Sequence, residues 1–196
     1  MTAKDLQLIQ EYAPQLNGVL TQADLKMIFS EQSEAALYKK LASFVAEKIL
    51  VKIKRGVYAL PSATLQTISS RLCSSAYIST GTVLANKLVI GSVPARRLQA
   101  IRVGCPHAYT CPQGTIEHLS VKPELYFGFE PQNGVLMATP EKAFLDVCYF
   151  MRKGHTFSFD PVEDVTLERL DLSRVRSYLA AYDPRFQGWV KKTWGL

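Results

Sequence analysis

The sequence predicts an α+β protein with two domains. Helical and alternating patterns are mixed along the chain, so neither an all-helical nor an all-strand fold accounts for it. The chain has 196 residues, which suits one large domain or two small ones. The character of the sequence changes after a short strand pattern that ends at Pro61. We therefore expect two domains, residues 1–61 and residues 62–196.

The composition excludes several classes of protein. The chain is 47% hydrophobic and 20% charged, which excludes disordered, collagen-like and low-complexity proteins. No apolar run approaches the roughly 18 residues that a membrane-spanning helix needs, and the first residues lack the pattern of a secretory signal. The four cysteines are then expected to be reduced thiols. We expect a cytoplasmic protein with no membrane partner.

Three helical patterns occupy the first 49 residues. Thr21 and Asp24 form a capping-box pattern before the second helix, and Ser33 is the expected N-cap of the third. Pro14 ends the first helix near Tyr12. The apolar residues repeat at helical spacing in each pattern: Leu6, Ile9 and Ala13; Leu25, Ile28 and Phe29; Leu37, Leu41, Phe44 and Val45.

A basic hairpin follows the third helix. Val51 and Ile53 alternate with Lys52 and Lys54, as in a half-buried strand, and a turn at residues 55–56 leads to a returning strand over 57–60. Three short helices followed by a basic hairpin predict a winged helix-turn-helix. In that fold the third helix enters the DNA major groove.

The polar face of the third helix and the hairpin supply candidate DNA-binding residues. The helix would present hydroxyl groups and lysines opposite its apolar face, and the hairpin would present three cations on one outward edge. The candidates are Ser33, Tyr38, Lys39, Lys40, Ser43, Lys52, Lys54 and Arg55. Alternatively, these charges only solubilise a small helical domain, or the domain is a protein-interaction module.

The net charge of +6 is unevenly distributed. Residues 33–120 hold eleven basic and three acidic side chains, whereas residues 121–196 hold ten of each. Beyond the hairpin, a second basic cluster comprises Lys87, Arg96, Arg97 and Arg102. It would extend a DNA footprint, face an acidic or RNA-associated partner, or belong to a solvated loop.

The second domain is expected to combine a small, mostly antiparallel sheet with C-terminal helices. Helices are expected over 63–73, from the N-cap Ser79 to Lys87, over 170–182 and over 183–194. Strands are expected over 98–103, 115–121, 125–129 and 134–137, with a loop or hairpin over 104–114. Thr139 and Pro140 begin an almost wholly apolar helix that extends to Met151.

Residues that could form a metal or catalytic site also fit purely structural roles. Two cysteines and two histidines lie close in the sequence: Cys105, His107, Cys111 and His118. Their spacing is not a common zinc pattern, so we expect them to be ordinary loop and strand residues without a metal. We expect Glu141 to favour the helix dipole and Asp146 to pair with a basic residue. Motifs for phosphate loops and nucleophile elbows are absent. The expectation is a protein without cofactor, metal or enzymatic activity.

Three segments together resemble the AbiEi family, the antitoxins of type IV (abortive-infection) toxin–antitoxin systems. They are Arg55-Gly-Val-Tyr-Ala-Leu60, Ala76-Tyr-Ile-Ser79 and Ala138-Thr-Pro-Glu-Lys-Ala-Phe-Leu-Asp146. The resemblance spans roughly residues 15–185 and carries nothing for residues 104–114 or the chain after Tyr182. It implies a winged helix-turn-helix that binds inverted repeats in the protein's own promoter and represses it. It also implies a non-enzymatic C-terminal domain that antagonises a co-encoded, nucleotidyltransferase-like toxin.

The expected function is thus a DNA-binding transcriptional repressor that autoregulates its operon and acts as an antitoxin. Its partners would be double-stranded DNA, with two copies on an inverted repeat, and the cognate toxin. Two alternatives stay open: a winged-helix protein–protein adaptor without a DNA role, and a sequence-unspecific nucleic-acid binder.

Overall fold

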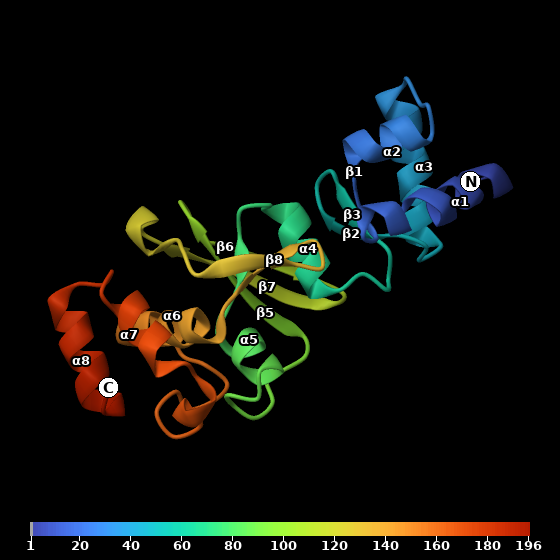
Figure 1. The fold of residues 1–196 in the computed structure, drawn as a ribbon. Helices are drawn as coiled ribbons and strands as arrows, with labels where there is room; N and C mark the ends of the chain where they lie inside the picture. The colour runs from blue at the N-terminus through green and yellow to red at the C-terminus, as the bar shows by residue number, and fades with distance from the viewer. Residues whose placement is uncertain (1) are drawn as a thin grey trace.

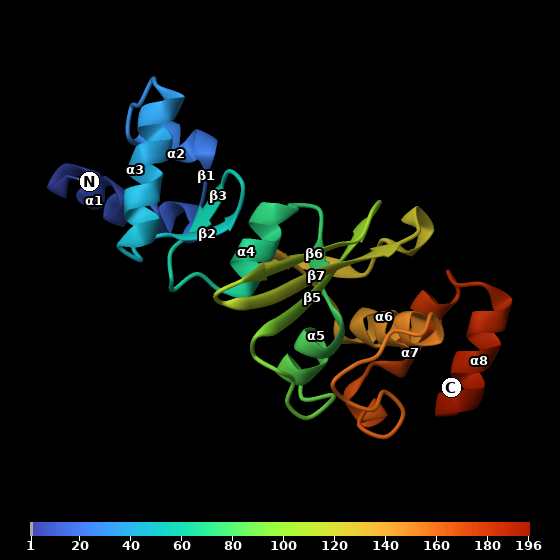
Figure 2. The same ribbon diagram turned by 180° about the vertical axis from the view of Figure 1, so that it is seen from behind.

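A computed structural model describes residues 2–196 as a mixed α+β protein with two sheets (Figures 1 and 2). The helices are α1 (Ala3–Tyr12), α2 (Gln22–Ile28), α3 (Glu34–Ala46), α4 (Leu65–Leu72), α5 (Thr80–Asn86), α6 (Pro140–Arg152), α7 (Leu172–Leu179) and α8 (Pro184–Trp194). The strands are β1 (Val19–Thr21), β2 (Val51–Lys54), β3 (Val57–Ala59), β4 (Tyr77–Ile78), β5 (Arg97–Val103), β6 (His107–Cys111), β7 (Gly114–Val121), β8 (Phe129–Gln132) and β9 (Val135–Ala138). Short 3-10 turns lie at Pro14–Leu16, Pro123–Leu125 and Leu167–Arg169.

The N-terminal part packs α1, α2 and α3 against a small antiparallel sheet, with strand order β1-β3-β2. The predicted caps are present: Thr21 and Asp24 form a complete capping box at α2, and the Ser33 side chain accepts a hydrogen bond from the Ala36 amide. Leu20, Leu25, Leu37 and Phe44 belong to the core of this part. Local sequence signals therefore predicted these helix starts correctly.

The second sheet is larger and more mixed than predicted. Its six strands lie in the order β6-β7-β5-β4-β9-β8. The β5–β7 and β4–β9 pairs are parallel, and the other neighbours are antiparallel. The segment expected as a loop or hairpin over 104–114 is a hairpin, in which β6 turns back into β7. Because this hairpin reverses the chain a second time, β7 runs in the same direction as β5.

One strand prediction in this part was wrong, and one predicted N-cap is present in position without its side-chain hydrogen bond. The strand expected over 125–129 is largely a 3-10 turn and irregular chain, and β8 begins only at Phe129. Gly128 there has a φ of +73°, which interrupts an extended chain. Ser79 precedes α5 as expected but makes no side-chain cap, because its hydroxyl donates to Asp146 instead.

Helices cover the second sheet unequally. Figure 1 shows α4 between this sheet and the N-terminal part. Helices α5, α6 and α7 lie farther from the N-terminal part. Helix α6 begins at the predicted Thr139 N-cap, and nearly every residue from Glu141 to Phe150 is buried. This burial explains the apolar character of α6. Across residues 2–196, no helix has the length and apolar character needed to cross a membrane.

One hydrophobic core extends across the expected domain boundary. It contains Val19, Ile53, Val57 and Ala59 of the small sheet together with the core of the larger sheet. The small sheet is therefore covered on both faces, by α1–α3 on one side and by the second part of the chain on the other.

Candidate nucleic-acid interface

Helix α3 is held in place by one apolar face and exposes the other. Leu37, Leu41 and Phe44 are buried against the N-terminal core. The exposed residues of the outer face include Ala35, Tyr38, Lys39, Ala42 and Ala46. Most of these side chains are small, so a flat ligand surface can approach the helix backbone closely. The predicted candidate Ser33 is exposed at the N-cap of this helix, and Ser43 is only half-buried.

A groove separates α3 from the hairpin. Its volume is about 440 Å³, and it is lined by Tyr38, Leu41, Ala42, Val45, Ala46, Lys52 and Tyr58. Three kinds of group meet there: an aromatic hydroxyl from α3, small alanines, and a lysine ammonium group from β2. This combination offers a cation for a phosphate and a polar group for a base edge.

Gln22 is a polar residue at this site that the sequence reasoning missed. The Tyr38 hydroxyl donates to Gln22 Oε1 at 3.1 Å. The backbone N–H of Gln22 donates to the carbonyl of Gly56, at the hairpin turn, at 2.8 Å. Gln22 therefore joins α2, α3 and the hairpin. The position of Gln22 directly after the N-cap Thr21 follows from the sequence, but its contact with Tyr38 depends on the tertiary fold.

The two adjacent lysines of α3 differ in their surroundings. Lys39 is exposed and, within residues 2–196, forms no ion pair. The Lys40 ammonium lies 2.9 Å from Asp5 Oδ1 and 4.7 Å from the centre of the Phe29 ring. Burial raises the pKa of Asp5, but the hydrogen bonds from Lys40 and Thr2 outweigh it and lower the pKa to about 2. Lys40 thus ties α3 to α1, and Lys39 is the freer of the two cations.

The hairpin does not carry its three cations on one edge, so that expectation was wrong. A bulge lies between Lys52 and Lys54: Lys52 pairs with Tyr58, and Lys54 pairs with Val57. Opposite residues share a face, so the two lysines lie on opposite faces of the sheet. Lys52 borders the α3 groove, whereas the Lys54 ammonium lies 5.4 Å from the centre of the Tyr109 ring in β6. Arg55 is exposed at the turn.

The residues of the second basic cluster, Lys87, Arg96, Arg97 and Arg102, lie at three places in the fold. Arg96 and Arg97 lie at the start of β5: Arg96 donates to the Pro112 carbonyl at 2.6 Å, and Arg97 pairs with Glu117 at 2.8 Å. Lys87 is exposed at the end of α5. Arg102 lies near the other end of β5, where its Nε donates to the Val103 carbonyl. The four residues therefore do not form one continuous patch along this strand.

The motif-like helix α6 holds a fully buried polar network. Lys142 and Asp146 form an ion pair whose side chains are both inaccessible to solvent, which confirms that Asp146 pairs with a basic residue. Asp146 also accepts hydrogen bonds from Ser79 at 2.7 Å and Tyr77 at 3.1 Å, and Lys142 donates to the Tyr182 hydroxyl at 3.1 Å. Burial raises the pKa of Asp146, while Lys142 and the hydroxyl groups oppose that shift. The network joins the end of β4, helix α6 and the link between α7 and α8.

Among the remaining candidates, His118, Cys111 and Glu141 have local partners, whereas Cys105 and His107 are exposed. His118 Nε2 lies 2.9 Å from the Ser69 hydroxyl, and Cys111 Sγ donates to the Gly114 carbonyl. Burial lowers the pKa of His118 to about 4, so this ring is neutral near pH 7. Glu141 is buried in the first turn of α6, and its Oε1 accepts from the Asp171 amide at 3.2 Å. Within residues 2–196, no three His, Cys, Asp or Glu side chains cluster as metal ligands would.

No protein-family model matches the chain, and no curated protein matches it significantly.

Proposed function

We propose that this protein is a DNA-binding transcriptional repressor whose N-terminal part is a winged helix-turn-helix. The observation that carries the proposal is the exposed outer face of α3 beside the groove that Lys52 borders. Lys39, Lys52 and Arg55 would neutralise phosphates, and Tyr38 with Gln22 would face the base edges. Lys40 and Lys54 would contribute less, because each already has a partner within the chain.

The resemblance to the AbiEi family supports the rest of the proposal. The protein would bind inverted repeats in its own promoter, as two copies, and would autoregulate its operon. It would act in the cytoplasm as a non-enzymatic antitoxin against a co-encoded, nucleotidyltransferase-like toxin. In this proposal the Lys142–Asp146 network supports the fold and does no chemistry, because both side chains are closed to solvent.

An electrophoretic mobility shift with the protein's own upstream DNA tests the repressor function. We expect a shift at low salt that weakens steeply as salt rises, because phosphate contacts release counterions. A scrambled duplex of the same length is the control. Equal binding to both duplexes would favour a sequence-unspecific nucleic-acid binder, and no shift with folded protein would contradict the proposal.

Expression of the neighbouring reading frame tests the antitoxin function. We expect that frame to arrest growth when expressed alone and this protein to restore growth when it is supplied as well. A neighbour that is harmless alone, or toxicity that this protein leaves unchanged, would contradict the antitoxin function without touching the repressor function.

A protein–protein adaptor is the second candidate, and one observation favours it. Two of the five lysines and arginines proposed on α3 and the hairpin contact other residues of the chain, which reduces the free charge for DNA. An adaptor would bind its partner protein with little salt dependence and would not shift promoter DNA.

A further inference from the structure

Leu88 occupies a position that stability alone does not explain. It follows α5 with a φ of +57°, and its side chain is 65% exposed. The Leu88 amide donates to the Ala85 carbonyl, and the Val89 amide donates to the Leu84 carbonyl. This is a Schellman motif, whose left-handed residue is usually glycine because a side chain there is strained. A leucine there strains the backbone, and this one gains little from burial because it is 65% exposed.

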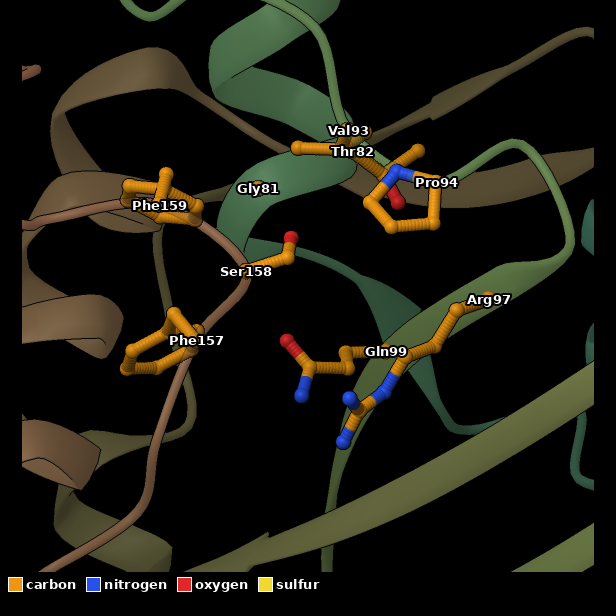
Figure 3. Close-up of a pocket in the computed structure, with 9 residues that line it drawn as sticks. All are labelled: Gly81, Thr82, Val93, Pro94, Arg97, Gln99, Phe157, Ser158 and Phe159. Carbon is orange, nitrogen blue, oxygen red and sulfur yellow. The ribbon is translucent and has the colours of Figure 1, made fainter.

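Leu88 lines a groove of about 780 Å³. Its apolar lining comes from α4, α5 and the loop before β5, and includes Leu65, Ala85, Ile90, Val93 and Pro94. It shares Thr82, Val93, Pro94 and Arg97 with a small neighbouring hollow. Figure 3 shows the Arg97 and Gln99 side chains reaching into that hollow opposite Phe157 and Ser158. The groove lining is thus more apolar than polar, with uncharged polar side chains such as Thr64, Gln66 and Gln113 among it, and Arg97 lies where the groove meets the hollow.

Cations flank this groove, and no described residue that lines it is acidic. Arg97 lines it directly, and its neighbours Arg96 in the chain and Lys87 beside Leu88 are both exposed. Glu117 offsets part of the charge of Arg97, but Arg96 donates only to an uncharged carbonyl. The groove therefore combines an apolar lining with a net positive rim.

We propose that this groove, which we call the Leu88 groove, docks a segment of a partner protein that carries apolar side chains flanked by aspartate or glutamate. Leu88 and the apolar lining would cover the apolar side chains, and Lys87, Arg96 and Arg97 would face the carboxylates. This docking assigns a role to three of the four residues of the second basic cluster. It does not depend on DNA binding by the N-terminal part.

The lining favours a protein segment over a nucleic acid. Single strands are bound by aromatic platforms beside a line of cations. The residues that line the Leu88 groove itself include no aromatic side chain, and its apolar lining residues are aliphatic. Aliphatic side chains beside a strained, exposed leucine match the apolar side chains of a peptide.

Selection from a random-peptide phage library on the full-length protein tests the proposal, with the Leu88→Gly variant as the matched target. We expect the enriched peptides to carry leucine, isoleucine or phenylalanine next to acidic residues. Leu88→Gly should bind them at least about tenfold more weakly, because it removes a buried apolar contact. The same variant should unfold at a higher temperature than the wild type, because glycine relieves the left-handed strain.

Lys48→Gly is the control for the backbone effect. Lys48 has a φ of +58° after α3, with the same pair of amide-to-carbonyl bonds, and it does not line the Leu88 groove. This variant should gain stability and keep peptide affinity. The reverse-charge variant Arg97→Glu should bind the acidic peptides with an affinity at least about tenfold lower.

Three results would overturn the proposal. No peptide is enriched, or the enriched peptides bind Leu88→Gly and Arg97→Glu as tightly as the wild type. The third result concerns a fluorescent oligo-dT or oligo-U probe that binds the wild type. If both variants bind this probe more weakly but bind the peptides as tightly as the wild type does, the groove would be assigned to nucleic acid.

Discussion

At the scale of single residues, the Lys142–Asp146 pair is the most consequential feature. Both side chains are inaccessible to solvent, and three hydroxyl groups complete their hydrogen bonds. Breaking such a pair leaves one charge buried without a counter-charge, which costs more than the pair itself contributes.

Asp146→Asn should therefore destabilise the protein by about 3–5 kcal/mol. Urea unfolding followed by circular dichroism measures this loss. Glu124→Gln is the control, because the Lys122–Glu124 pair is mostly exposed, with its atoms 3.9 Å apart, and should change stability by less than about 1 kcal/mol. Equal losses in the two variants would contradict the role given to burial.

Replacing both charges of the buried pair should restore part of that loss. The double variant Lys142→Met with Asp146→Leu leaves no unpaired charge, so we expect it to be more stable than Asp146→Asn. The unfolding midpoint in urea compares them. A double variant that is less stable would mean that the surrounding hydroxyl groups, left without partners, dominate the energetics.

His118 predicts a pH dependence of stability. Burial, with smaller contributions from Arg102, His107 and Lys54, holds its pKa near 4, whereas the unfolded chain titrates near 6.5. Between these values the unfolded state binds a proton that the folded state does not. Stability should therefore fall as the pH drops from 6.5 towards 4. Unfolding of wild type and His118→Gln across that range measures it, and identical slopes would refute the assignment.

At the scale of elements, α3 and the hairpin show what local sequence does and does not determine. The start of α3 at Ser33 and its buried face were predictable, because capping and periodicity involve neighbours along the chain. The contact of Lys40 with Asp5 joins residues 35 positions apart, and the bulge that separates Lys52 from Lys54 depends on pairing with β3. No local pattern encodes either feature.

These surroundings predict different consequences for two adjacent lysines. Lys39→Ala should weaken promoter binding by roughly 1 kcal/mol and lower the salt slope by about one, with unchanged stability. Lys40→Ala should act mainly on stability, since it removes the partner of Asp5. Mobility shifts over a salt series, paired with thermal unfolding, separate the two. Equal loss of affinity from both variants, at equal stability, would mean that Lys40 leaves Asp5 to reach DNA.

At the scale of the whole molecule, the order of strands was the hardest feature to predict. The α+β class and most strands followed from periodicity, but β5 and β7 were separated by a segment whose strand character was left open. The candidate site divides in the same way. Its exposed cations were visible in the sequence, whereas Gln22 and the partners of Lys40 and Lys54 depend on tertiary contacts.

The core shared between the two parts predicts a single unfolding transition. Val57 and Ile53 of the small sheet belong to the same buried cluster as the larger sheet. We expect one calorimetric peak whose midpoint matches that from circular dichroism. Ile53→Asp should uncouple the parts and produce two transitions, because it places a charge in the shared core. Two well-separated transitions in the wild type would contradict this coupling.

The double coverage of the small sheet also bears on how two copies would meet an operator. A recognition element on a flexible tether can reach half-sites at many separations, since its linker stretches. Here the hairpin is wedged between the helices and the second part of the chain. The protein itself would then fix the separation between the recognition helices of two bound copies. Inserting half a helical turn of DNA between the repeats would place one copy on the far side of the duplex.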